Sequence, residues 1–226
     1  MIMLFDLVIN LLITDLIQLC CMIAWVLPKD WILSGGFILV PIYGYCLVAS
    51  IGFMVCIALE RYLVIACPSW YCFRRTIKVS VLVCVVVWAL PAVIFCLIIA
   101  GNTMTNAGIL LLLPLPLFIF FLGGTLKALS ASISVHSDEK RRIVGMLVLV
   151  LLIYTLLFLP TIILFLARGS SVIDEYKLRN LSSTFVKLSP LAHLFLYIFM
   201  RKGTIDKLLA SVCCCRMDSD DISSPV

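Results

Sequence analysis

The feature that most constrains this chain is a series of six long, almost uncharged apolar runs. They cover residues 7–27, 32–59, 79–100, 107–126, 143–167 and 180–200. A helix of about 20 apolar residues crosses a bilayer. In lipid the backbone groups of such a segment must be satisfied within the segment itself. The sequence therefore predicts an all-α, polytopic membrane bundle with six transmembrane helices.

Composition excludes the soluble classes of protein. Of 226 residues, 64% are hydrophobic and 13% are charged, whereas soluble domains average about 25% charged residues. A soluble enzyme, a disordered chain and a nucleic-acid binder are all excluded on this ground. The spans also contain no paired carboxylates, no Ser/His/Asp set and no cysteine and histidine spacing typical of a metal site. We expect no enzymatic activity, no cofactor and no disulfide.

The distribution of basic residues predicts the orientation. Twelve of the 17 lysines and arginines lie in the segments 60–78, 127–142 and 201–226, and four lie in the alternate segments. The positive-inside rule places the first set in the cytoplasm. Both chain ends are then cytoplasmic, which agrees with six spans.

Two parts follow the last run. We expect a bundle over residues 1–212, with an amphipathic helix at 201–212 on the inner leaflet, and a cytoplasmic tail over 213–226. The cysteines Cys213, Cys214 and Cys215 are candidates for lipidation by palmitoylation, with three unmodified thiols as the alternative. The acidic, serine-containing end of the tail is a candidate for phosphorylation.

Several short motifs occur in a fixed order along the chain. They are Asn10–Asp15 (NLLITD), Glu60–Pro68 (ERYLVIACP), Trp88, Pro116, Phe158–Pro160 (FLP) and Tyr197–Phe199 (YIF). Together they resemble the helices two to seven of the rhodopsin-like (class A) G-protein-coupled receptor family. The chain begins at the second helix of that pattern, so we expect the first transmembrane helix of the family to be lacking.

The resemblance implies a receptor at the plasma membrane that transmits a ligand signal to a heterotrimeric G protein. Within that pattern, Glu60, Arg61 and Tyr62 at the inner end of the second run, together with Tyr197, are the G-protein coupling residues. The chain departs from the family at Gly123–Gly124, where the fifth-helix tyrosine is replaced.

A polar core is expected from Asp15, Ser50, Ser189 and His193. In the family an ion site lies at the level of Asp15, and the alternative here is a weak sodium site at Asp15, Ser50 and Ser189. Because an imidazole occupies the position of the family asparagine, we expect His193 to pair with Asp15 directly. The purely structural alternative is that both groups are simply hydrogen-bonded within the bundle.

The ligand site is expected at the outer half of the bundle. Lys187 is a charge inside a span and hence a functional candidate, with Tyr43 and Phe158 lining the same pocket. The alternative is a lysine that snorkels to the interface. The short outer loops favour a small or lipid-like ligand, and Lys187 favours an anionic one. Membrane lipids are further partners, and a receptor dimer is an additional alternative.

Two other functions remain open on the sequence alone. The first is a truncated, non-signalling receptor remnant that modulates full-length receptors. The second is a multi-pass transporter, which is less favoured because the chain has no repeat of interrupted half-helices.

Overall fold

The computed structural model describes residues 2–26, 29–66, 77–101, 104–131, 137–166 and 175–199, and all of the regular structure in these ranges is α-helical. The helices are α1 (Ile2–Val26), α2 (Lys29–Ala66), α4 (Ile77–Gly101), α5 (Met104–Leu112), α6 (Pro114–Ala131), α7 (Ser137–Leu166) and α8 (Glu175–Lys187). The chain is helical again over 189–199. The predicted all-α fold is confirmed.

The helices coincide with the six apolar runs. The fourth run is divided between α5 and α6, and the sixth between α8 and the helix at 189–199. Among the described residues, five helical stretches are long and apolar enough to cross a membrane, and the apolar part of α4, Lys78–Ile94, is shorter. These lengths and compositions define a multi-pass helical membrane bundle. The predicted amphipathic helix at 201–212 and the tail at 213–226, with its three cysteines, lie outside the described residues.

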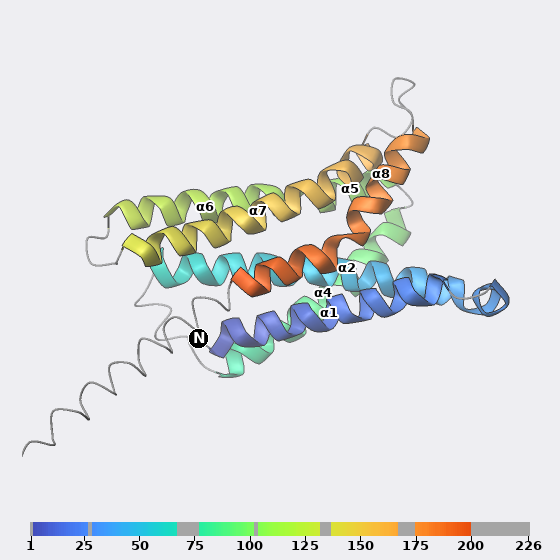
Figure 1. The fold of residues 1–226 in the computed structure, drawn as a ribbon, viewed down its shortest axis with the longest axis horizontal. Coiled ribbons are helices and arrows are strands. Elements are labelled where there is room, and N and C mark those ends of the chain that lie inside the picture. The colour runs from blue at the N-terminus through green and yellow to red at the C-terminus, as the bar shows by residue number, and fades with distance from the viewer. Residues whose placement is uncertain are drawn as a thin grey trace, which may run out of the picture.

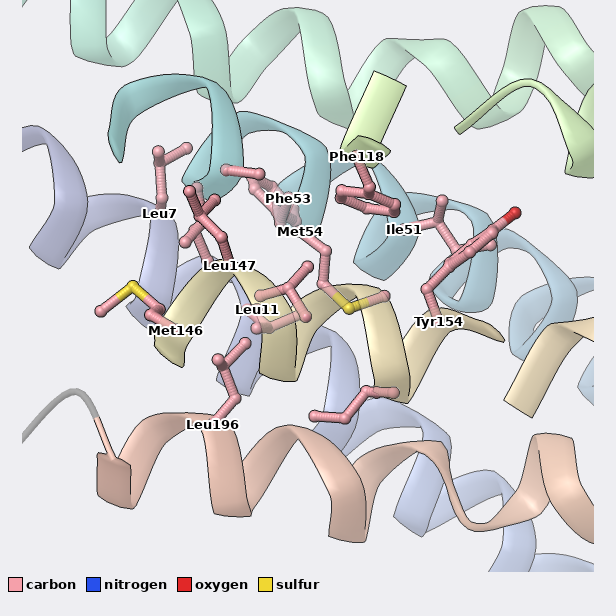
Figure 2. Close-up of a cluster of buried hydrophobic side chains, with 14 of the residues drawn as sticks. Leu7, Leu11, Ile51, Phe53, Met54, Phe118, Met146, Leu147, Tyr154 and Leu196 are labelled. Carbon is pink, nitrogen blue, oxygen red and sulfur yellow. The ribbon is translucent and has the colours of Figure 1, made fainter. Parts of the chain in front are cut away.

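The long helices lie side by side and alternate in direction (Figure 1). The central member is α2, which packs against α1, α4, α6 and α7. It contributes Phe53, Met54 and Ile57 to the main apolar core, each with no exposed surface. Figure 2 shows this core, where side chains of α1, α2, α6, α7 and the last helix meet. Because α2 is surrounded, it positions groups at both ends of the bundle.

The outer surface of the bundle is apolar. Large aliphatic side chains such as Leu16 on α1, Leu82 on α4 and Leu156 on α7 are each more than half exposed. A contiguous surface of this kind is unfavourable in water. In a bilayer it is the surface that contacts lipid, which explains why so many hydrophobic residues lie outside the core.

Prolines interrupt or bend the helices at several points. Pro41, Pro91 and Pro160 lie inside α2, α4 and α7. The chain leaves regular helix at Leu113, directly before Pro114, and at Leu188, two residues before Pro190. Proline has no N–H and its ring disturbs the preceding turn, so it leaves carbonyl oxygens without a helical partner. In lipid these oxygens need another donor.

Tyrosines of neighbouring helices donate to carbonyl oxygens beside three of these prolines. The Tyr43 hydroxyl of α2 donates to the carbonyl oxygen of Val186 at 3.2 Å, and this is the oxygen that an N–H at position 190 would otherwise contact. Tyr154 of α7 donates to the carbonyl of Leu111, beside the break between α5 and α6. Tyr45 donates to the carbonyl of Trp88, in the turn before Pro91. Each kink is thereby tied to an adjacent helix.

We predict that Tyr43→Phe destabilises the protein by about 1 kcal/mol, the net value of one hydrogen bond. In a Pro190→Ala background the restored N–H can satisfy the Val186 carbonyl. The same Tyr43→Phe change should then cost clearly less. Unfolding in detergent micelles, followed by circular dichroism for the four proteins of this cycle, measures both costs. Equal costs in the two backgrounds would contradict the account.

Candidate functional site

The centre of the bundle contains polar side chains from two helices. On α1, Asp15 and Gln18 are three residues apart, and in the last helix Ser189 and His193 are four apart. These spacings place each pair on one helix face. The two faces meet, and all four residues are buried.

The two groups of this polar core form direct contacts. The His193 Nδ1 atom lies 2.8 Å from Asp15 Oδ1. The Ser189 hydroxyl donates to Gln18 Oε1 at 3.1 Å. The contact expected between Asp15 and His193 is therefore present in the structure, and its part in signalling is a proposal. Gln18 was missed by the motif analysis, although its spacing from Asp15 on the same face could have indicated it.

The sodium alternative required Asp15, Ser50 and Ser189 to share an ion. The Ser50 hydroxyl donates to the carbonyl of Leu47 in its own helix, at 2.8 Å. The Ser189 hydroxyl is directed to Gln18, and one oxygen of Asp15 is engaged by His193. The histidine thus engages one carboxylate oxygen, Oδ1, whereas the other oxygen, Oδ2, is buried without a hydrogen-bond partner.

Asp15→Asn and His193→Gln should show a coupling of about 1–2 kcal/mol in a double-mutant cycle, the upper range for polar contacts between membrane helices. The physical reason is that the two changes remove the same contact. Ser50→Ala is the matched control, and its cost should add to that of Asp15→Asn. The measurement is unfolding in micelles with and without sodium chloride. Coupling of Asp15 to Ser50, together with stabilisation by sodium but not by choline, would favour the ion site instead.

A second polar contact joins α1 to α4. The Trp88 indole N–H donates to Asn10 Oδ1 at 2.9 Å, and the Ser80 hydroxyl donates to Asp6 Oδ2 at 2.7 Å. Asn10 and Trp88 each belong to a motif recognised in the sequence. The structure brings them together and so fixes α4 against the helix that carries Asp15.

The C-terminal end of α2, expected to be its inner end, carries Glu60, Arg61 and Tyr62. Glu60 is buried, while Arg61 and Tyr62 are half-buried. The Tyr62 ring lies against two aromatic rings of α6, with centroid distances of 5.8 Å to both Phe120 and Phe121. Of the expected coupling residues, Tyr62 therefore lies at the interface between α2 and α6. Tyr197 of the last helix packs against the main core.

Gly124 of α6 makes room for the Tyr62 ring. A Cβ atom at position 124 would lie 2.6 Å from Tyr62 Cε2, whereas one at Gly123 would meet nothing within 4 Å. The departure from the family pattern at Gly123–Gly124 thus has a local physical reason at one of the two glycines. The space that a side chain at 124 would fill is occupied by Tyr62.

The structure separates the three residues expected to form one ligand pocket. Tyr43 and Lys187 both lie near Trp25 of α1. The ring centroids of Tyr43 and Trp25 are 5.3 Å apart, and the Lys187 ammonium is 5.9 Å from the centroid of Trp25. Lys187 is exposed. Its cationic contact with Trp25 was not foreseen from the sequence.

Phe158 lies elsewhere, in the wall of a cavity of about 840 Å³ formed by α2, α4, α5, α6, α7 and α8. Neither Tyr43 nor Lys187 lines this cavity. Its polar lining residues include Arg179 and Ser182 of α8, with Thr161 of α7. The two hydroxyl oxygens of Thr161 and Ser182 are 2.6 Å apart. The basic group of this cavity is therefore Arg179.

Comparison with known proteins agrees with the geometry. Residues 5–108 match the family described as 7 transmembrane receptor (rhodopsin family). This segment includes the motifs at Asp15, Glu60–Tyr62 and Trp88. The predicted resemblance to rhodopsin-like G-protein-coupled receptors is thereby confirmed over this segment.

Two curated receptors are similar over part of the chain. G-protein coupled receptor 68 of Homo sapiens is 38% identical over 88 residues, which are 35% of this chain and 24% of that receptor. G-protein coupled receptor 68 of Mus musculus is 35% identical with the same coverage. The similar segment thus spans about a quarter of the length of these relatives.

Proposed function

We propose that this protein is a plasma-membrane receptor that transmits a ligand signal to a cytoplasmic heterotrimeric G protein. The observation that carries the proposal is the inner end of α2. There a buried Glu60, Arg61 and Tyr62 occur together, in the segment that matches the receptor family, and Tyr62 contacts α6. A group at this position can respond to a displacement of α6 relative to α2.

The proposed orientation puts this end in the cytoplasm. The ends of α2 and α6 and the beginnings of α1, α4 and α7 lie together at one end of the bundle (Figure 1). Lys78, Lys127, Arg141 and Arg142 belong to these same helix ends. Their charge supports a cytoplasmic location by the positive-inside rule.

Two contacts would connect the outer half of the bundle to this end. The pair of Asp15 and His193 joins α1 to the last helix at mid-bundle. The contact of Tyr62 with α6 then lies at the inner end. In the proposed mechanism, a ligand that shifts α6 or α7 changes the second contact, and Arg61 meets the G protein. The packing of the Tyr62 ring beside Gly124 stabilises the resting arrangement of α2 and α6.

Arg61→Ala should reduce receptor-dependent nucleotide exchange to the level of membranes without the protein, because the group that meets the G protein is removed. The assay is guanine-nucleotide exchange in membranes that co-express this chain with each class of Gα subunit. Lys127→Gln is the control, since it removes an exposed basic charge from the same end of the bundle. Equal exchange by wild type and Arg61→Ala, measured at matched surface expression, would contradict the proposal.

Gly124→Ala should raise basal exchange several-fold, because the new methyl group displaces the Tyr62 ring from α6. Gly123→Ala is a matched control, since its methyl group enters open space. Either alanine favours the helix by about 0.5–1 kcal/mol relative to glycine, so propensity alone affects both variants alike. Basal exchange in the two variants decides the matter. Equal basal exchange in the two variants would show that the packing of Tyr62 beside Gly124 does not control coupling.

A further inference from the structure

The cavity that contains Phe158 is polar at one end and apolar over the rest of its length. Its polar lining groups are Arg179, Ser182 and Ser183 of α8 and Thr161 of α7. The other described lining residues carry hydrocarbon side chains, are glycines, or in the case of Cys56 carry a thiol. No acidic side chain of the described residues lines the cavity.

The cavity is long as well as amphipathic. Along α2 its lining residues extend from Gly44 to Cys56, which corresponds to about 18 Å at 1.5 Å per residue. Its volume of about 840 Å³ lies toward the upper end of the roughly 300–1,000 Å³ typical of ligand pockets. A compact polar ligand would leave most of this apolar surface uncovered. A molecule with one polar end and a long hydrocarbon part would cover it.

The charge of Arg179 selects the polar end. A guanidinium binds carboxylate and phosphate oxygens through paired hydrogen bonds. The hydroxyls of Ser182 and Thr161 line the same end of the cavity and hydrogen-bond each other. One O–H therefore remains to donate to an anionic headgroup there, beside the cation. Arg179 is near the start of α8, which begins at the end of the bundle opposite the last residues of α2 (Figure 1). In the proposed orientation this end is the outer one, where a headgroup would lie at the membrane surface.

We propose that this cavity binds a single-chain anionic amphiphile, with its carboxylate or phosphate head at Arg179 and its acyl chain between α2, α4 and α6. The inference rests on the proposed receptor function in one respect: the bound amphiphile is the ligand whose signal the receptor transmits. The bound chain would contact Phe158 of α7 and Leu117 of α6. The ligand would therefore contact α6 and α7, the helices whose inner halves contact α2 and the last helix.

Photoaffinity labelling of the full chain in phosphatidylcholine nanodiscs tests the site directly. The probes are three diazirine-bearing molecules of equal chain length: a fatty acid, a lysophosphatidate and a neutral fatty alcohol. Both anionic probes should label peptides of α2 and α4, and the alcohol should bind at least about tenfold more weakly, the effect of losing a charge-assisted hydrogen bond. The ratio of the two anionic probes distinguishes a carboxylate from a phosphate ligand.

Two pairs of variants locate the ligand. Arg179→Gln should weaken the binding of both anionic probes about tenfold and leave the binding of the alcohol unchanged. Lys177→Gln is its control, because it removes a charge from the same helix outside the cavity lining. Val86→Trp should block labelling by filling the cavity. Val85→Trp is its control, because Val85 is similarly exposed, at 58% against 55%, but does not line the cavity. Normal labelling in Val86→Trp would overturn the proposal.

The remaining outcomes separate this inference from the proposed function. Equal binding of the alcohol and the anionic probes, or an unchanged affinity in Arg179→Gln, would mean that bilayer chains merely fill the cavity. If exchange depends on Arg61 while no anionic probe binds, the ligand site is wrong and the coupling function stands. If anionic probes bind as expected and no Gα class responds, the site stands and the coupling function is wrong.

Discussion

The structure depends on one constraint of the lipid environment, that polar groups inside the bundle must find their partners within the protein. The prolines of this chain leave carbonyl oxygens beside the kinks, and tyrosines of adjacent helices donate to them, as Tyr43 does to Val186. The pair of Asp15 and His193 follows this rule at one atom of each side chain, Oδ1 and Nδ1, whereas Oδ2 and Nε2 have no hydrogen-bond partner. Polar contacts of this kind join neighbouring helices, and the apolar core fills the space between them.

The central position of α2 gives these contacts a common frame. Its outer half lines the large cavity, its middle packs in the apolar core, and its inner end carries Glu60, Arg61 and Tyr62. In the proposed function a ligand in the cavity and a G protein at the inner end act on the two ends of one helix. The glycine at position 124 is part of that frame, because the Tyr62 ring occupies the space beside it.

The parts of the site that could be predicted are those built from ionisable residues, which are rare inside membrane spans. Asp15 and His193 stood out because ionisable groups are costly inside a span, so each needed a partner and few were available. The outer pocket was harder. Lys187 also stood out, but the direction in which its long side chain extends depends on packing, and it contacts Trp25. Arg179 lies between the fifth and sixth apolar runs, so its position in the sequence indicates only a charge in a loop. Its relation to the cavity depends on how α8 packs.

The sequence alone determined the class of fold, because the length and apolarity of its runs admit only helices that span a bilayer. It also determined the order of the spans and the level of the inner-end motif, since both follow from the linear positions of charges. The tertiary structure decided which helix faces meet. It separated Phe158 from Tyr43 and Lys187, paired Ser189 with Gln18, and brought Tyr62 against Gly124. These contacts depend on helix rotation and on kinks at prolines, which side-chain packing sets and apolar periodicity does not.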